Sequence, residues 1–179
     1  MNHEVSLHGK IFTELIPSAK IQERIAEIAS EINKEYFKKK PLFLGVLNGA
    51  FLFAADLFKN VNHDCEISFI RVSSYSGTAT TGNVKNVIGL NMDIEGRHLI
   101  IIEDIVDTGD TMNYLLGELD KHKPASVRIA TLVFKPDALR HKLDLQYVGF
   151  KVPTDFLVGY GLDYDGLGRN LNSIYVLKQ

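Results

Sequence analysis

The strongest constraint on the fold is a regular alternation of strand-length apolar runs with helical patterns. Such alternation indicates βαβ units, which build a mainly parallel sheet with helices on its faces. In folds of this kind, ligands bind beyond the carboxyl ends of the strands. The expected strands are 42–47, 66–72, 98–102, 127–134, 147–152 and 156–160, with Ile174–Leu177 as an edge strand, and the expected helices between them are 50–58 and 111–122.

An amphipathic helix is predicted ahead of the first strand. Ser18 can cap its first turn, and Pro41 ends it because proline cannot continue a helix. Its apolar positions recur at steps of three and four residues, which is typical of a helix packed on a core: Ile21, Ile25, Ile28, Ile32 and Tyr36.

Composition narrows the class of protein. A chain of 179 residues with 45% hydrophobic residues suits one domain, residues 1–179. The formal net charge of -2 gives no basic surface for nucleic acid. No apolar run reaches the roughly 18 residues of a membrane-spanning helix, and the first residues lack a signal-peptide pattern. Cys65 stands alone, so no intrachain disulfide can form and a cytoplasmic protein is expected.

The chemistry is concentrated in segment 99–111, LIIIEDIVDTGDT. Glu103 and Asp104 follow a buried-strand pattern, and two adjacent acids there need a cation or hydroxyl donors. The next polar residues supply hydroxyls, a glycine for tight backbone geometry and the free amides of a helix start, which suit a monophosphate. A strand-to-helix turn with capping residues would explain Thr108 or Asp110, but not the paired acids. The segment therefore predicts a site for a phosphorylated sugar.

This segment resembles the signature by which type I phosphoribosyltransferases bind 5-phosphoribosyl-1-pyrophosphate (PRPP). The resemblance extends from about residue 41 to residue 177 and is strongest to the hypoxanthine-guanine enzymes of the family. It implies an α/β, Rossmann-like fold, with a mainly parallel sheet flanked by helices and a small hood formed by N- and C-terminal segments. It also implies Mg²⁺ as cofactor and a dimeric or tetrameric assembly.

The resemblance assigns a role to each residue of the segment. Glu103 and Asp104 would bind the ribose hydroxyls and take part in the magnesium site. Asp107 would be the general base near purine N7. The loop that binds the 5′-phosphate, mostly through backbone amides, would consist of Thr108, Gly109, Asp110 and Thr111. An acid inside such a loop must turn its side chain outward, which is expected of Asp110.

Further site residues follow from the same resemblance. Asn48 and Gly49 match the pyrophosphate loop, in which a non-proline cis peptide presents an amide, although many relatives have a basic residue in place of Asn48. An ordinary Asn-Gly turn is the alternative. Arg169 would also meet the pyrophosphate. Ser74 and Tyr75, in the polar stretch 73–86, match a mobile catalytic lid, and by composition this stretch is a surface loop.

The purine-binding residues lie towards the end of the chain. Lys135 would donate to purine O6, and because adenine has a donor at that position, a fixed lysine favours 6-oxopurines. Phe156 would stack on the base, the Leu157 backbone would read its edge, and Asp163 would bind magnesium directly or through water. Without the resemblance, Phe156 would be a core residue and Lys135 a solvated charge.

The expected activity is the transfer of the 5-phosphoribosyl group from PRPP to N9 of hypoxanthine or guanine, with release of pyrophosphate. A preference for xanthine or adenine is the alternative within this class. A PRPP-sensing regulator that binds RNA is the alternative from another class, and the charge of the chain disfavours it. A receiver-like phosphoacceptor domain would explain acids at strand ends, but not the residues around Phe156 and Asp163.

Overall fold

The main sheet has six strands. The computed structural model describes residues 3–75 and 84–178, with the backbone alone for residues 73–75 and 84–86. Within these residues the strand order is β5-β4-β3-β6-β7-β8; β5 pairs antiparallel with β4, and all other pairs are parallel. The strands are β3 (Leu42–Val46), β4 (Glu66–Tyr75), β5 (Val84–Ile88), β6 (His98–Val106), β7 (Ser126–Phe134) and β8 (Tyr147–Lys151).

The order of the strands reverses at β3. The next strand in the chain, β4, lies on one side of β3, and β6 lies on the other. The crevice beyond the carboxyl ends of two such strands is where open α/β sheets bind ligands. The segments that leave these ends begin at Leu47 and Asp107. The topology thus brings the two predicted phosphate-binding loops to the same place.

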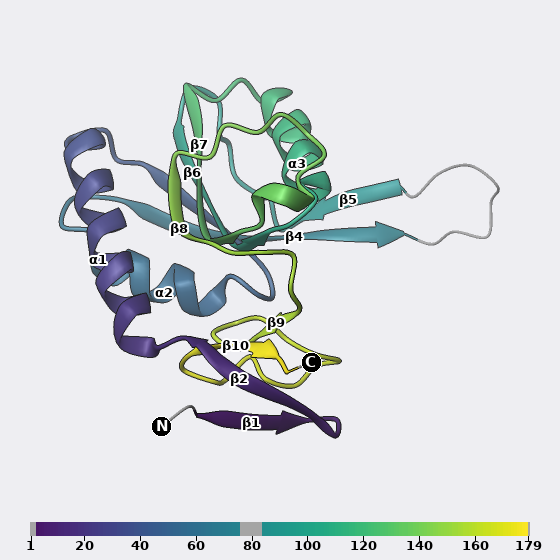
Figure 1. The fold of residues 1–179 in the computed structure, drawn as a ribbon. Coiled ribbons are helices and arrows are strands. Elements are labelled where there is room, and N and C mark those ends of the chain that lie inside the picture. Colours follow the sequence, from purple (N-terminus) through teal and green to yellow (C-terminus); the bar gives the residue numbers. More distant parts are fainter. Residues whose placement is uncertain (1–2, 76–83, 179) are drawn as a thin grey trace.

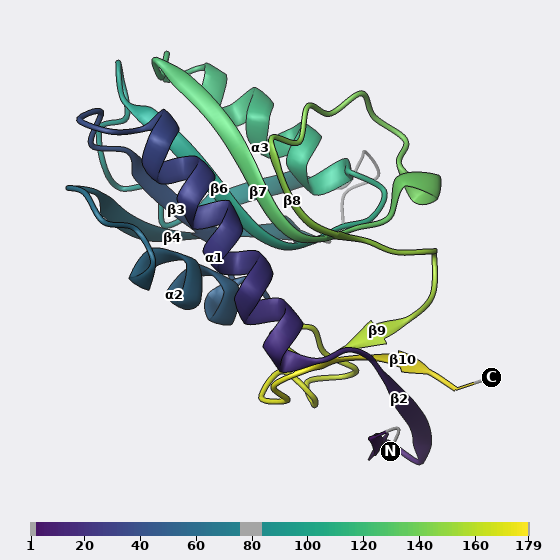
Figure 2. The ribbon, with the colours of Figure 1, turned by 60° about the vertical axis from the view of Figure 1, so that its left-hand side comes forward.

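Helices cover both faces of this sheet. Helices α1 (Ser18–Glu35) and α2 (Phe51–Lys59) pack on one face, and α3 (Asp110–Asp120) packs on the other (Figures 1 and 2). The predicted apolar stripe of α1 is confirmed, since its isoleucines and Tyr36 are buried in the hydrophobic core that α1 and α2 form with the sheet. Among the described helices, none has the length and apolar character needed to cross a bilayer.

A smaller antiparallel sheet forms the predicted hood from both ends of the chain. Its strand order is β1-β2-β10-β9, and Figure 1 shows it below the main sheet, with the first and the last strand of the chain in it. Phe12, Val158 and Tyr175 form its own small core. The strands are β1 (Glu4–Leu7), β2 (Lys10–Ile16), β9 (Leu157–Val158) and β10 (Ile174–Leu177).

Two predicted strand boundaries were wrong in ways that affect the site. The strand expected at 98–102 continues to Val106, so Glu103 and Asp104 lie inside β6 instead of after it. The strand expected at 156–160 is reduced to two residues. Residues 159, 160 and 161 have φ angles of 98°, 49° and 97°, a left-handed conformation that cannot continue a strand.

The predicted ends of helix α1 were also wrong. The N-cap position is Pro17, and the backbone N–H of Ser18 donates to Ser173 Oγ at 3.0 Å, so a side chain near β10 satisfies the helix start. The helix ends at Glu35, before Pro41.

The polar stretch 73–86 was predicted as a loop, but its two ends are strands. Tyr75 pairs with Val84, and Ser74 pairs with Lys85, as β4 and β5 extend into it. Residues 76–83 lie outside the described residues.

Candidate active site

Strand β6 supplies side chains to two adjacent clefts. The phosphate cleft has a volume of about 270 Å³ and is lined by Glu103 and residues 105–112. The base cleft, about 250 Å³, includes Asp104, Ile105 and Asp107 in its lining. Of the two neighbouring acids, Glu103 lines the phosphate cleft and Asp104 lines the base cleft. Ile105 and Asp107 belong to both, which places Asp107 between them.

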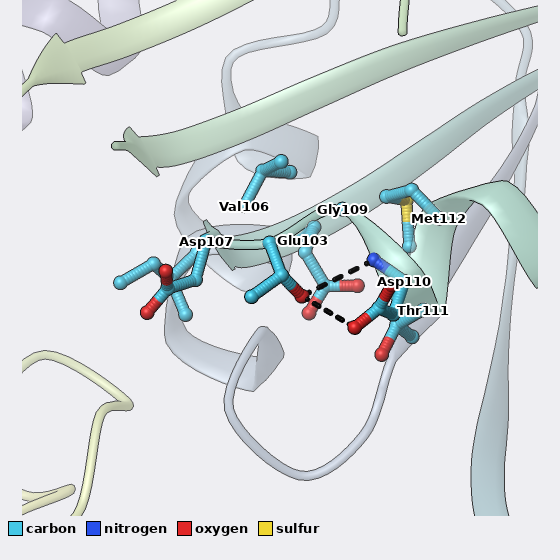
Figure 3. A pocket seen from close by; sticks show the side chains of 9 residues that line it. Glu103, Val106, Asp107, Gly109, Asp110, Thr111 and Met112 are labelled. Carbon is cyan, nitrogen blue, oxygen red and sulfur yellow. Dashed lines mark hydrogen bonds between the residues drawn. The ribbon is translucent and has the colours of Figure 1, made fainter. Parts of the chain in front are cut away.

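The phosphate cleft is built on the turn from β6 into α3. Gly109 is the N-cap of α3, with a φ of 82°, a conformation that glycine adopts without strain. The first turn of a helix presents amides without intrahelical partners to the space in front of it. Figure 3 shows the side chains around this space, and its dashed lines mark the two hydrogen bonds between Thr108 and Asp110. The arrangement agrees with the predicted monophosphate site.

The paired acids are buried at the end of β6. Glu103 and Asp104 are 8% and 9% exposed. Burial, together with the charge of Asp104, raises the pKa of Glu103 well above its ordinary value. Burial also raises the pKa of Asp104, against the opposing effects of a hydrogen bond with the Glu103 side chain, the Ile105 N–H and the charge of Arg169. Within the described part of the chain, Glu103 Oε2 is a buried oxygen without a hydrogen-bond partner.

Glu103→Gln is expected to stabilise the ligand-free protein, and more so as the pH rises. Above its ordinary pKa of 4.5, the Glu103 carboxyl keeps its proton in the folded protein more than in the unfolded chain, so this group makes the wild type less stable as the pH rises. Glutamine removes this loss, because it carries no charge in either state. At pH 8 with EDTA, we expect a melting temperature higher by about 3 °C or more.

Thermal unfolding from pH 5 to pH 8 would measure this effect. The exposed Glu95→Gln is the matched control and should show no growing difference from the wild type. An equal or lower melting temperature for Glu103→Gln across the whole range would contradict the burial argument.

The predicted pyrophosphate loop lies directly against Asp104. The Leu47–Asn48 peptide bond is cis, as the resemblance implied. A Cβ added to Gly49 would lie 1.6 Å from Asp104 Oδ2, far closer than atoms can approach. On the other side, a Cβ on Gly161 would lie 2.0 Å from the Gly49 carbonyl oxygen. The loop is therefore held between β6 and the segment after β9, with no room for a side chain at position 49.

The base cleft gathers the predicted purine-binding residues. Lys135 is buried, and its Nζ donates to Asp107 Oδ2 at 3.1 Å. Phe156 is 46% exposed, so it is a wall of the cleft and not a core residue. Its ring lies 5.4 Å from that of Tyr164, edge to face. The complete lining is Asp104, Ile105, Asp107, Lys135, Phe156, Leu157, Leu162 and Asp163.

Asp163 and Arg169 form an ion pair at the edge of this cleft. Arg169 Nη2 lies 2.5 Å from Asp163 Oδ1, and Nη1 donates to the Gly161 carbonyl oxygen at 2.6 Å. Asp163 also accepts from the Gly166 N–H at 2.8 Å. Glu103, Asp104 and Asp163 therefore do not meet in one cluster, and no three His, Cys, Asp or Glu side chains in residues 3–75 and 84–178 gather closely enough to hold a metal.

Tyr160, which the sequence analysis did not identify, connects the hood to helix α2 of the main sheet's first face. Its hydroxyl donates to Asp56 Oδ2 at 2.5 Å, and Gln22 donates to the same oxygen at 2.8 Å. Burial acts to raise the pKa of Asp56, but hydrogen bonds from Lys59, Tyr160 and Gln22 hold it below its usual value. Because α2 starts just after the pyrophosphate loop, this network ties that loop to the hood. Asp56 and Tyr160 are 104 positions apart, and no local motif links them.

The predicted lid residues are described only in part. Ser74 and Tyr75 end β4, and their side chains lie outside the described atoms. The lid therefore stays a prediction.

Comparison with known proteins agrees with this geometry. The family model for the phosphoribosyl transferase domain matches residues 13–165. The hypoxanthine-guanine phosphoribosyltransferase of Bacillus subtilis is 43% identical over 165 residues, which cover 92% of each chain. A solved hypoxanthine phosphoribosyltransferase from Staphylococcus aureus superposes with a TM-score of 0.86 at 37% identity, covering 92% of this chain and 90% of the other.

A longer protein also contains a similar region. The bifunctional protein TilS/HprT of Listeria monocytogenes is 44% identical over 174 residues, or 97% of this chain, and the chain spans 27% of its length. The family resemblance seen in the sequence is thus confirmed. A family match over most of the residues, and two clefts on the strand that carries its signature, lead to one conclusion: the chain belongs to the phosphoribosyl transferase family.

Proposed function

We propose that this protein transfers the 5-phosphoribosyl group of PRPP to N9 of hypoxanthine or guanine, in purine salvage. The observation that carries the proposal is the pair of adjoining clefts that share Asp107. One has the helix amides and hydroxyls that suit a sugar phosphate, and the other has the lysine, aromatic ring and acid that suit a 6-oxopurine. The names of the relatives support the same substrates.

The contact between Lys135 and Asp107 suggests how the base is recognised. In the free protein the ammonium and the carboxylate satisfy each other at 3.1 Å. Purine O6 and N7 lie next to each other on one edge of the base, and in the tautomer with a hydrogen on N7, O6 accepts while N7 donates. A bound 6-oxopurine would take the lysine hydrogen bond at O6 and present the proton on N7 to Asp107. Each side chain then exchanges one partner for another, so neither charge is left buried alone.

The reaction follows from these positions. The bond from C1′ to the pyrophosphate oxygen breaks, and the bond from C1′ to N9 forms. The purine becomes acidic as it gains the ribosyl cation, so a carboxylate is a sufficient base, and Asp107 takes the proton. The backbone around Asn48 and Gly49, with Arg169, would meet the departing pyrophosphate. Ser74 and Tyr75 would belong to a lid that excludes water from the cationic transition state.

Magnesium fits the acids at the end of β6. The unpartnered Glu103 Oε2 and the adjacent Asp104 are hard oxygen donors in a buried place. Glu103 and Asp104 would hold the ion together with oxygens of PRPP and water, and Asp163 would join directly or through water. When bound, the ion would neutralise charge on the pyrophosphate.

We further propose a homo-oligomeric, cytoplasmic protein with residues 1–179 as one phosphoribosyltransferase domain.

Nucleotide formation from hypoxanthine, guanine, xanthine and adenine, each with PRPP and Mg²⁺, tests the proposal directly. We expect product from one or both of hypoxanthine and guanine, and much less from adenine. If neither of these two bases yields nucleotide, the proposed function is wrong. Efficient use of adenine would contradict the role given to Lys135.

Lys135→Met is expected to lower kcat/KM for hypoxanthine by about a hundredfold, because it removes the O6 donor and leaves Asp107 without its partner. The loss for adenine should be far smaller, since adenine offers no acceptor at that position. The exposed Lys151→Met, near the end of β8, is the control and should leave both values unchanged. An unaltered ratio of hypoxanthine to adenine use in Lys135→Met would exclude O6 recognition by this lysine.

A further inference from the structure

The phosphate loop, residues 108–111, is backed by the segment 136–145 that follows Lys135. The backbone N–H of Arg140 donates to the Thr108 carbonyl oxygen at 3.0 Å. Leu139 and Leu143 pack against Gly109 so closely that a Cβ there would lie 2.9 Å from a methyl group of each. The segment therefore supports the loop, and its leucines pack in the same hydrophobic cluster as Val106 of β6 and Met112 of α3.

Asp110 poses an electrostatic problem for this loop. It is the first residue of α3 and lines the phosphate cleft. The positive end of the helix attracts its carboxylate just as it attracts a bound phosphate. A free carboxylate at this position would compete with the phosphate for the same amides and would repel it. A working site needs the Asp110 carboxylate to be engaged elsewhere.

Each carboxylate oxygen of Asp110 has a hydrogen-bond partner, His141 for one and Thr108 for the other. Asp110 Oδ1 lies 2.5 Å from His141 Nε2, and Oδ2 accepts from Thr108 Oγ1 at 2.9 Å. The hydrogen bond from His141, followed by that from Thr108, lowers the pKa of Asp110 below its ordinary value. An ionised carboxylate only accepts, so Nε2 carries the hydrogen of the His141 contact.

We propose that His141 is a positioning residue for phosphate binding: it holds the Asp110 carboxylate at the wall of the cleft by a hydrogen bond, so that the helix amides are left for the 5′-phosphate. This inference rests on the proposed function of the cleft. His141 reaches the loop from the segment that follows Lys135, 31 positions from Asp110.

The test is the affinity of purified variants for PRPP with Mg²⁺ and for ribose 5-phosphate, measured by isothermal titration calorimetry. His141→Ala should bind both about tenfold more weakly, because it removes the hydrogen bond that holds the Asp110 carboxylate away from the phosphate. His141→Gln keeps an N–H donor and should remain within about threefold of the wild type. The adjacent, exposed Lys142→Ala removes a positive charge from the same segment and should have no effect.

The double variant His141→Ala/Asp110→Asn separates this role from a structural one. With the negative charge gone, histidine is no longer needed, so binding should recover to within about threefold of the wild type. If His141 only supports the fold, the double variant will bind as weakly as His141→Ala or more weakly, and the proposal is overturned. Unchanged affinity in His141→Ala would also overturn it. A wild type that binds neither PRPP nor ribose 5-phosphate would instead refute the proposed function.

Discussion

Asp107→Asn is expected to lower kcat by about a hundredfold or more, because general bases typically contribute 10²- to 10⁴-fold to a rate. Asparagine has nearly the same shape, and its amide oxygen can still accept from Lys135, but it cannot take up a proton. Asp107 stands between the phosphate and base clefts, and its side chain is 48% exposed, so the change should not disturb the core. The dissociation constant for PRPP should stay within about threefold of the wild-type value.

Steady-state kinetics with hypoxanthine and calorimetric binding of PRPP would measure the two quantities separately. Asp144→Asn, an exposed acid in the segment behind the phosphate loop, is the control and should leave both unchanged. Normal turnover with weakened PRPP binding would assign Asp107 to the donor site and would reject its role as the base.

Gly49→Ala is expected to abolish most activity, by about a hundredfold or more, and to weaken PRPP binding. The new methyl carbon would lie 1.6 Å from Asp104 Oδ2 and 2.3 Å from its Cγ, so either the acid or the loop must move. Both have a role in the proposed donor site. Overpacking of this kind typically costs about 1–3 kcal/mol in the free energy of unfolding.

Two further variants separate the contact from a general effect of removing a glycine. Gly117→Ala, inside α3 and with open space around its Cα, should be neutral or slightly stabilising. Gly49→Ala/Asp104→Ala removes the overlapping carboxylate, so denaturant unfolding should show recovered stability while activity stays low. If Gly49→Ala retains wild-type activity and stability, the close contact with Asp104 has no functional importance.

The sequence predicted the main sheet well, because buried parallel strands are continuous apolar runs. Leu42, His98 and Ser126 begin strands within one residue of the predicted starts. The predicted end of β6 was wrong for a physical reason. Two acidic residues usually mark the end of a buried strand, but Glu103 and Asp104 remain in β-sheet geometry at the ligand-binding end of β6.

Strands β1, β2 and β5 were not predicted, and two of them have little local signal. Strand β5 is short and lies at an edge of the sheet, and β1 is a four-residue strand in the hood with two exposed positions. Neither forms a long apolar run. Their pairing partners, not their own residues, stabilise them.

Much of the candidate site could be named from the sequence only through the resemblance. Lys135, Phe156 and Asp163 are unremarkable alone, yet the structure places all three around one cleft. The contacts that support the site residues could not be predicted from the sequence. Tyr160 meets Asp56, and His141 meets Asp110, across separations that no motif spans, and a single histidine or tyrosine gives no indication of its partner.

Strand β6 is paired on both sides, with β3 and β7, and it carries the acids of both clefts. The spacing between the sugar-phosphate site and the base site is therefore set by a central strand of the main sheet. The hood contributes the aromatic wall of the base cleft from outside this sheet. Both sites nevertheless draw on both parts of the chain, because Lys135 follows β7 of the main sheet, while Asp163 and Arg169 come from the segment after β9. A protein engineer who rebuilds the hood to change the acceptor would therefore also alter the residues proposed to meet magnesium and pyrophosphate.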